Sequence, residues 1–239
     1  MTTASGQPPA DGQPADGPSP AAGLPPEVEA TAAEVEAAVA ERTIFFSDAV
    51  VAIAITLLAL ALPLPTGSTN PDMLHSLADH SDAYIAFLIS FAVIGNHWSA
   101  HRQLFRYVDR LNKLVMQLNM LWLLMMVITP FATRLLSGSG GFGVRFSIYA
   151  LVQAVAALCM LLMTRQVLRA RLMRPGAPGD VGGIHITNLI LIIALFLISI
   201  PISFVTGWAY LCWVAIPVAM RIAERYRARA RPAGPGEDG

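Results

Sequence analysis

The sequence predicts an all-α membrane protein whose chain crosses the bilayer six times. Hydrophobic residues make up 55% of the 239 residues and charged residues only 13%, about half the charged share of a soluble domain. Residues 49–71, 146–164 and 181–220 contain no Asp, Glu, Lys or Arg, and about 20 apolar residues suffice for a helix to cross the hydrocarbon core. Residues 50–55 do not alternate between polar and apolar as the strands of a membrane barrel would, so the spans are expected to be helices.

We expect the spans at about residues 45–62, 83–98, 114–136, 146–164, 184–204 and 208–220. The first ends at Pro63 and Pro65, and the third contains Pro130 near its far end. The uncharged stretch 181–220 is long enough for two spans, and Pro201 and Gly207 near its middle favour a turn there. The alternative is a chain of five spans in which this stretch forms one long bent helix.

The membrane region is expected at residues 27–228, between two loose tails. Residues 1–26 are rich in Pro, Gly, Ala, Ser and Asp and have no apolar face, so we expect a disordered tail. Pro25 and Pro26 could open a short acidic helix that carries several glutamates. Residues 229–239 are expected to form a second disordered tail.

The distribution of basic residues predicts the orientation. Fourteen of the sixteen Lys and Arg residues fall on one side of the predicted spans, whereas only Arg134 and Arg145 fall on the other. The side rich in Lys and Arg is normally cytoplasmic, which places both termini in the cytoplasm and the protein in the cell membrane. The fourteen are Arg42, Arg102, Arg106, Arg110, Lys113, Arg165, Arg169, Arg171, Arg174, Arg221, Arg225, Arg227, Arg229 and Arg231. Because topology explains each basic cluster, we expect no nucleic-acid partner.

Several other classes of function find little support in the residues. Cys159 and Cys212 lie inside predicted spans and far from any histidine pair, so we expect small apolar side chains with no metal site, although a disulfide is possible. A membrane enzyme would need a cluster of nucleophile and base, or of metal ligands, near the spans. The candidate residues are few and scattered, so we expect neither an enzyme nor a bound cofactor.

The start of the first span is the most informative segment. Asp48 enters a membrane helix, at an insertion cost of about 3 kcal/mol, and such residues usually face a protein interior or water. An alternative is that Asp48 is merely solvated at the level of the headgroups. Arg42 and Asp48 are separated by about 600° around a helix, so they do not share a face. Each is therefore expected to find its partners on other helices or other subunits.

These residues carry a resemblance to a known family. Arg42, Phe46, Ser47 and Asp48 form the pattern Arg-x-x-x-Phe-Ser-Asp, which is followed by Ala-Val-Val-Ala-Ile-Ala-Ile-Thr-Leu-Leu. This segment resembles the first-helix signature of the transmembrane protein 175 family of potassium channels. Weaker matches are Asn96-His97-Trp98-Ser99-Ala100-His101 and the stretch from Leu123 to Thr133. The resemblance covers about residues 41–225, and its single six-span unit is similar to the prokaryotic members.

The resemblance implies a homotetramer in which four copies of the first span line a central potassium pore. The sequence contains no Thr-Val-Gly-Tyr-Gly segment, so a carbonyl filter of the ordinary kind is not expected. Carried onto this chain, the family's apolar constriction falls on Ile53, Leu57 and Leu60. Their spacing of four and three residues places them on one helix face. Thr56 lies beside Ile53, where the resemblance implies a contribution to ion selectivity.

The remaining motif residues are assigned a structural role by the same resemblance. Arg42, Phe46, Ser47 and Asp48 would hold the first helix in register with its neighbours through a polar network, which His97, Trp98 and His101 are expected to join. A ring of branched apolar side chains excludes water when it is narrow. We therefore expect a hydrophobic gate with modest selectivity for potassium over sodium.

Two alternatives remain open from the residues. A secondary transporter or proton-conducting carrier would use Asp48 and His97 as a relay, although the paired broken helices typical of many transporters are not evident in the first half of the chain. A non-conducting membrane scaffold is compatible with the same composition.

Overall fold

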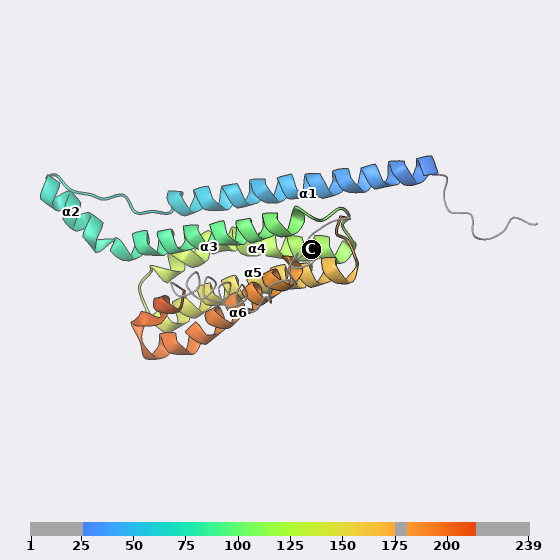
Figure 1. Cartoon of the computed structure of the whole chain (residues 1–239). Helices are drawn as coiled ribbons and strands as arrows, with labels where there is room; N and C mark the ends of the chain where they lie inside the picture. The colour runs from blue at the N-terminus through green and yellow to red at the C-terminus, as the bar shows by residue number, and fades with distance from the viewer. Residues whose placement is uncertain (1–25, 175–180, 214–239) are drawn as a thin grey trace, which may run out of the picture. The chain divides into compact units, whose positions relative to one another are not determined.

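The computed structural model describes residues 26–174 and 181–213, and every regular element in these ranges is helical. The helices are α1 (Pro26–Leu60), α2 (Asn70–Asp79), α3 (Ser81–Phe105), α4 (Lys113–Leu136), α5 (Phe142–Arg169) and α6 (Val181–Val205), and a 3₁₀ turn, η1, follows at Gly207–Ala209 (Figure 1). The chain divides into two compact units, residues 1–35 and 36–239. The description below concerns the second unit unless stated otherwise.

Five of these helices are long and apolar enough to span a membrane. They coincide with the first five predicted spans, but the helices continue past the apolar windows, as α3 does to Phe105 and α5 to Arg169. The backbone hydrogen bonds of a helix continue into segments that contain charged residues, so a hydropathy window underestimates the length of the helix. The expected short acidic helix is not separate, because α1 runs without a break from Pro26 to Leu60.

The predicted sixth span lies mostly outside the described residues. After α6, which continues through Pro201 to Val205, the chain turns at Thr206. The Thr206 hydroxyl accepts a hydrogen bond from the backbone N–H of Trp208, at 3.2 Å. Residues 210–213 are helical again. A turn therefore lies where Pro201 and Gly207 predicted one, and the number of spans stays a prediction.

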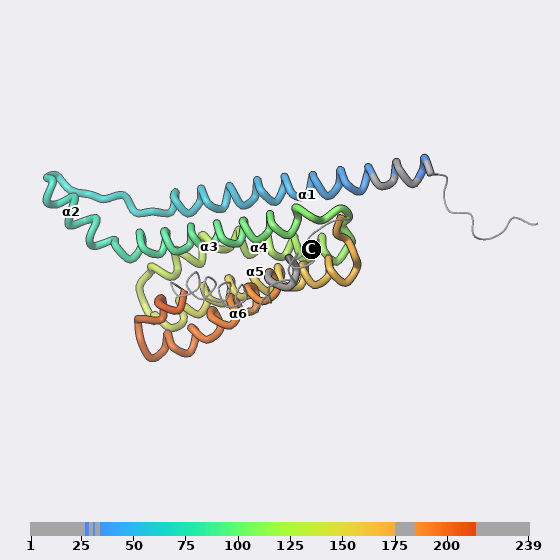
Figure 2. Tube along the Cα trace, viewed as in Figure 1, coloured from blue at the N-terminus to red at the C-terminus, as the bar shows by residue number. Residues whose placement is uncertain are grey.

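Packing is centred on α5. This helix packs most extensively against α4 and α6, and Figure 2 shows α4, α5 and α6 running side by side. One buried cluster joins α1, α3, α4 and α5 through residues such as Val51, Ile94, Trp122 and Met160. A second cluster, rich in aromatic rings, joins α5 to the segment after α6, where Trp213 stacks on Phe146 at 4.3 Å between ring centroids.

The loop after α1 contains a helix that hydropathy did not predict. The Thr69 side chain accepts from the backbone N–H of Asp72, and Asp72 accepts from the backbone N–H of Thr69, which forms a capping box at the start of α2. The hydrogen bonds from Thr69 and Ser68 hold the pKa of the Asp72 carboxyl below its ordinary value. A Cβ at Gly67 would lie 2.6 Å from the Asp72 Cβ, so glycine permits this close turn.

The two cysteines are free thiols. Cys159 is buried on α5, and Cys212 is partly buried after η1. Within residues 26–174 and 181–213 no group of three or more His, Cys, Asp or Glu side chains is placed to hold a metal ion.

Candidate functional site

Helix α1 has two faces of different character. Its buried side chains are Ala40, Ser47, Val51, Ala54 and Leu58. They follow one another at intervals of seven, four, three and four residues, which keeps them on one side of a helix. This side packs into the cluster that includes Ile94 and Trp122, so the opposite side of α1 is turned away from the other helices of the chain.

The residues of the expected constriction lie on this exposed side. The side chains of Ile53, Leu57 and Leu60 are 59%, 41% and 83% exposed, although they are large and apolar. Ile55, in contrast, packs against the buried core of the chain. An apolar face of this kind must be covered by lipid or by another protein surface, or must line a pore.

Thr56 lies on the same exposed side. Its hydroxyl donates a hydrogen bond to the backbone carbonyl of Ile53, at 2.8 Å. Because this bond uses the hydroxyl proton, the lone pairs of the exposed oxygen remain available as acceptors. The side chain can therefore act as an acceptor toward a cation that passes along the face.

One polar contact anchors α1 to α3. The indole N–H of Trp98 donates to a carboxylate oxygen of Asp48, at 2.8 Å. The guanidinium of Arg102 lies over the Trp98 ring, 5.0 Å from its centroid. Asp48 thus finds a partner on a neighbouring helix of the same chain.

A second, fully buried contact anchors α1 to α4. The amide of Asn119 donates to the Ser47 hydroxyl at 3.0 Å, and its oxygen accepts from Nε2 of His101 at 3.0 Å. His101 is stacked between Trp122 and Phe105, with centroid distances of 4.4 and 4.3 Å. The chain Ser47–Asn119–His101 therefore joins α1, α4 and α3 through buried polar groups.

Asn119 was missed by the sequence interpretation. It is an amide in a largely apolar helix, two residues after the amide of Gln117, and polar residues at such positions often bond across helices in membranes. The same signal marks Gln153 on α5, whose amide donates to the Thr129 hydroxyl at 3.2 Å, and Ser90 on α3, whose hydroxyl donates to Tyr149 at 3.1 Å.

The structure divides the expected polar network into separate parts. Ser47, Asp48, Trp98 and His101 make the contacts described above, whereas His97 is buried and lies beside Gln153. Arg42 and Phe46 lie on the exposed side of α1, and within the described part of the chain Arg42 makes no ion pair or hydrogen bond. These two residues are placed together with Ile53 and Leu60 rather than with the anchors.

Comparisons with known proteins find similarity to potassium channels. Residues 42–130 match the family model of the endosomal/lysosomal potassium channel TMEM175. A protein of Streptomyces collinus named as a potassium channel is 37% identical over 117 residues, which are 47% of this chain and 57% of that protein. A potassium channel of a Chryseobacterium species is 32% identical over 89 residues, 37% of this chain and 44% of that protein. The chain thus spans about half the length of the curated relatives it matches.

Solved structures extend the likeness beyond the matched segment. The crystal structure of a lysosomal potassium-selective channel TMEM175 homologue from Chamaesiphon minutus superposes with a TM-score of 0.62 at 26% identity, covering 82% of this chain and 100% of that one. A variant of the potassium channel MtTMEM175 shares the fold, with a TM-score of 0.56 at 19% identity over 79% of this chain and 93% of the other. The resemblance that the first-helix motif indicated is confirmed.

Proposed function

Because this chain is a relative of the TMEM175 potassium channels, we propose that it is the subunit of a potassium channel whose pore is lined by α1. The observation that carries the proposal is the exposed apolar side of α1, opposite the side that Asp48 and Ser47 anchor. Four copies arranged around a central axis would turn this side inward. The complete subunit would have six spans, with both termini in the cytoplasm and the channel in the cell membrane.

The constriction would be built from Ile53, Leu57 and Leu60 of each subunit. These side chains carry no group that can replace the hydration shell of an ion, so a narrow ring of them is dry and closed. A small rotation or tilt of α1 would widen the ring and admit water and ions together. Selectivity for potassium would be modest, with the Thr56 hydroxyls as acceptors near the constriction.

The anchors would keep the pore face in register. The donors of the hydrogen bonds to Asp48 and Ser47 come from α3 and α4, the two helices that pack behind α1. They fix the rotation of α1 about its axis, which decides the side chains that face the pore. Arg42 and Phe46, on the exposed side, would contact neighbouring subunits.

A carrier that relays protons between Asp48 and His97 has less support. Asp48 bonds Trp98, whereas His97 lies beside Gln153, and within the described residues no hydrogen-bond chain links the two sets.

Planar bilayer recordings of the purified full chain test the proposal. In a gradient of potassium chloride the channel should pass current without any coupled substrate, and the reversal potential in mixed solutions should favour potassium over sodium. Transport that requires a second solute or a proton gradient would support the carrier instead, and the absence of both current and coupled flux would support a scaffold.

A further inference from the structure

We infer that the end of α3, between Trp98 and Arg106, binds the headgroup of an anionic phospholipid. In the lipid we propose, a phosphodiester links the lipid to a hydroxylated head such as glycerol. The site is an open cavity of about 420 Å³ lined by Ile44, Trp98, Ser99, Arg102, Gln103, Phe105 and Arg106. It lies beside the anchored side of α1 and does not include the pore face. The inference therefore concerns lipid recognition and does not depend on ion conduction.

The two arginines supply the charge that a phosphate needs. Arg102 and Arg106 are exposed, and within the described residues neither has a carboxylate within ion-pair distance. In the next turn of the chain, Arg110 pairs with Glu36 at 3.3 Å. The two guanidinium groups of the cavity are thus available for an external anion, which arginine binds with two parallel hydrogen bonds.

The stacking of Arg102 on Trp98 orients this charge. The guanidinium lies over the ring face, so its N–H groups, which lie in its own plane, stay free at the edges. The indole N–H is bonded to Asp48, which fixes the ring that supports the arginine. A rigid platform of this kind lowers the entropy lost when a phosphate binds.

The level of the cavity fits a headgroup. Trp98, Arg102 and Arg106 lie near the end of α3, where the apolar run gives way to the basic segment 102–113. Tryptophan is enriched at this level of a bilayer, and basic pockets between helices on the cytoplasmic side bind anionic headgroups. Phe91, seven residues before Trp98 and on the same side of α3, is 49% exposed and can contact an acyl chain.

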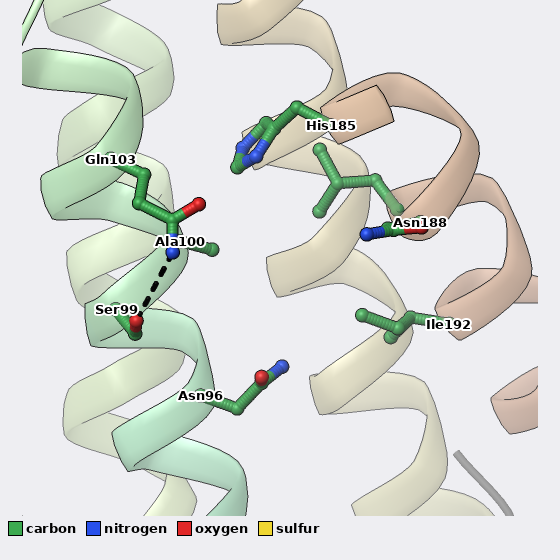
Figure 3. A pocket seen from close by; sticks show the side chains of 8 residues that line it. Asn96, Ser99, Ala100, Gln103, His185, Asn188 and Ile192 are labelled. Atoms are coloured by element: carbon green, nitrogen blue, oxygen red, sulfur yellow. Dashed lines mark hydrogen bonds between the residues drawn. The ribbon is translucent and has the colours of Figure 1, made fainter. Parts of the chain in front are cut away.

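The polar side chains next to the arginines favour a head that carries hydroxyl groups. Ser99 and Gln103 line this cavity and also a smaller one of about 70 Å³ between α3 and α6. Figure 3 shows Asn96, Ser99 and Gln103 on α3 facing His185 and Ile192 of α6 across the smaller cavity. Gln103 donates to Ser99 at 3.4 Å, and its amide oxygen remains an acceptor for a hydroxyl. Nε2 of His185 is buried and has no hydrogen-bond partner among residues 26–174 and 181–213, so a head of this type can also extend toward α6.

Thermal unfolding of the purified full chain in detergent tests the inference. Short-chain phosphatidylglycerol should raise the midpoint of unfolding in a saturable way, whereas phosphatidylcholine and sodium phosphate at the same concentrations should not. Arg102→Gln with Arg106→Gln should weaken the apparent affinity for phosphatidylglycerol about thirtyfold. The matched control is Arg165→Gln with Arg169→Gln, which removes two exposed charges on the same predicted side of the membrane but outside the cavity.

Each outcome decides the inference. It is supported if the cavity variant alone loses affinity, and it is overturned if the cavity variant binds like the parent or if the control loses as much. If sodium phosphate stabilises the protein as much as phosphatidylglycerol does, the cavity binds a free anion and the inference is overturned. If phosphatidylcholine stabilises it as much as phosphatidylglycerol does, binding does not depend on the charge of the lipid and the inference is overturned as well. If the double variant does not fold, Arg106→Gln alone decides, because Arg106 makes no stacking contact with Trp98. It should weaken binding about fivefold.

Discussion

At the scale of single residues, Thr56 combines a local hydrogen bond with an outward-facing acceptor. The bond to the Ile53 carbonyl fixes the orientation of the hydroxyl, so replacement by valine removes the acceptor and keeps nearly the same shape. We expect Thr56→Val to conduct with a reduced preference for potassium over sodium. Reversal potentials in mixed potassium and sodium solutions measure this preference, and an unchanged value would exclude Thr56 from selectivity.

Asp48 and Arg42 differ in where their partners lie. Asp48→Ala removes the acceptor of the Trp98 indole within the subunit, which should cost about 2 kcal/mol of subunit stability. Arg42→Ala removes no contact within the described part of the subunit, so we expect the fold to be retained and the assembly of subunits to weaken. Unfolding midpoints and size-exclusion profiles separate the two effects. Unchanged stability and assembly in both variants would mean that both side chains are only solvated.

The residues of the site could be predicted in part from the sequence. The positions of Ile53, Thr56, Leu57 and Leu60 followed from the first-helix resemblance, and their exposure agrees with a shared face. Asn119 could not be assigned a role, because its two partners lie on other helices, 72 and 18 residues away along the chain. Pairings of this kind depend on which helices pack together, and a single sequence does not encode that directly.

At the scale of helices, Asn119 joins three elements through one amide. Asn119→Ala would leave the Ser47 hydroxyl and the His101 ring each without a buried partner. We expect a loss of about 2 kcal/mol in the free energy of unfolding, together with a less sharply defined rotation of α1. Thermal unfolding of the purified protein measures the loss.

The control for Asn119 is Gln117→Ala, since Gln117 is exposed on the same helix. Equal stability of the two variants would show that the buried amide does not hold the helices together.

The extent of each helix was predicted less well than its existence. The predicted spans identified α1, α3, α4, α5 and α6, but α1 begins well before its predicted span, and α3 and α5 extend several residues beyond theirs. Helix α2 was missed because it is polar, although Thr69 and Asp72, with Pro71 between them, form a capping pattern that marks a helix start. Hydropathy identifies the segments that lie in lipid, whereas capping residues identify the position at which a helix begins.

At the scale of the whole molecule, the proposed topology has a direct consequence. Because fourteen of sixteen basic residues fall on one side, both termini should be cytoplasmic. Tags added before Met1 and after Gly239 should resist an external protease in intact cells and be cleaved after lysis. Cleavage of either tag from outside would contradict an even number of spans with cytoplasmic ends.

The central claim is that the exposed side of α1 faces a pore. Ile53→Asn would place an amide in every subunit of a ring of branched hydrocarbons, and polar side chains hold water in a narrow pore. Ile55, about 200° around the helix, is an unsuitable control because it packs against the core. Ile198 on α6 is a better match, since it is the same residue type and is 56% exposed against 59% for Ile53.

Bilayer recordings of Ile53→Asn and Ile198→Asn, each purified as the assembled protein, provide the most direct test. We expect Ile53→Asn to pass a larger current than the parent and to discriminate less between potassium and sodium, while Ile198→Asn behaves like the parent. If Ile53→Asn assembles normally and conducts like the parent, while Ile198→Asn alters conduction, the exposed side of α1 does not line the pore.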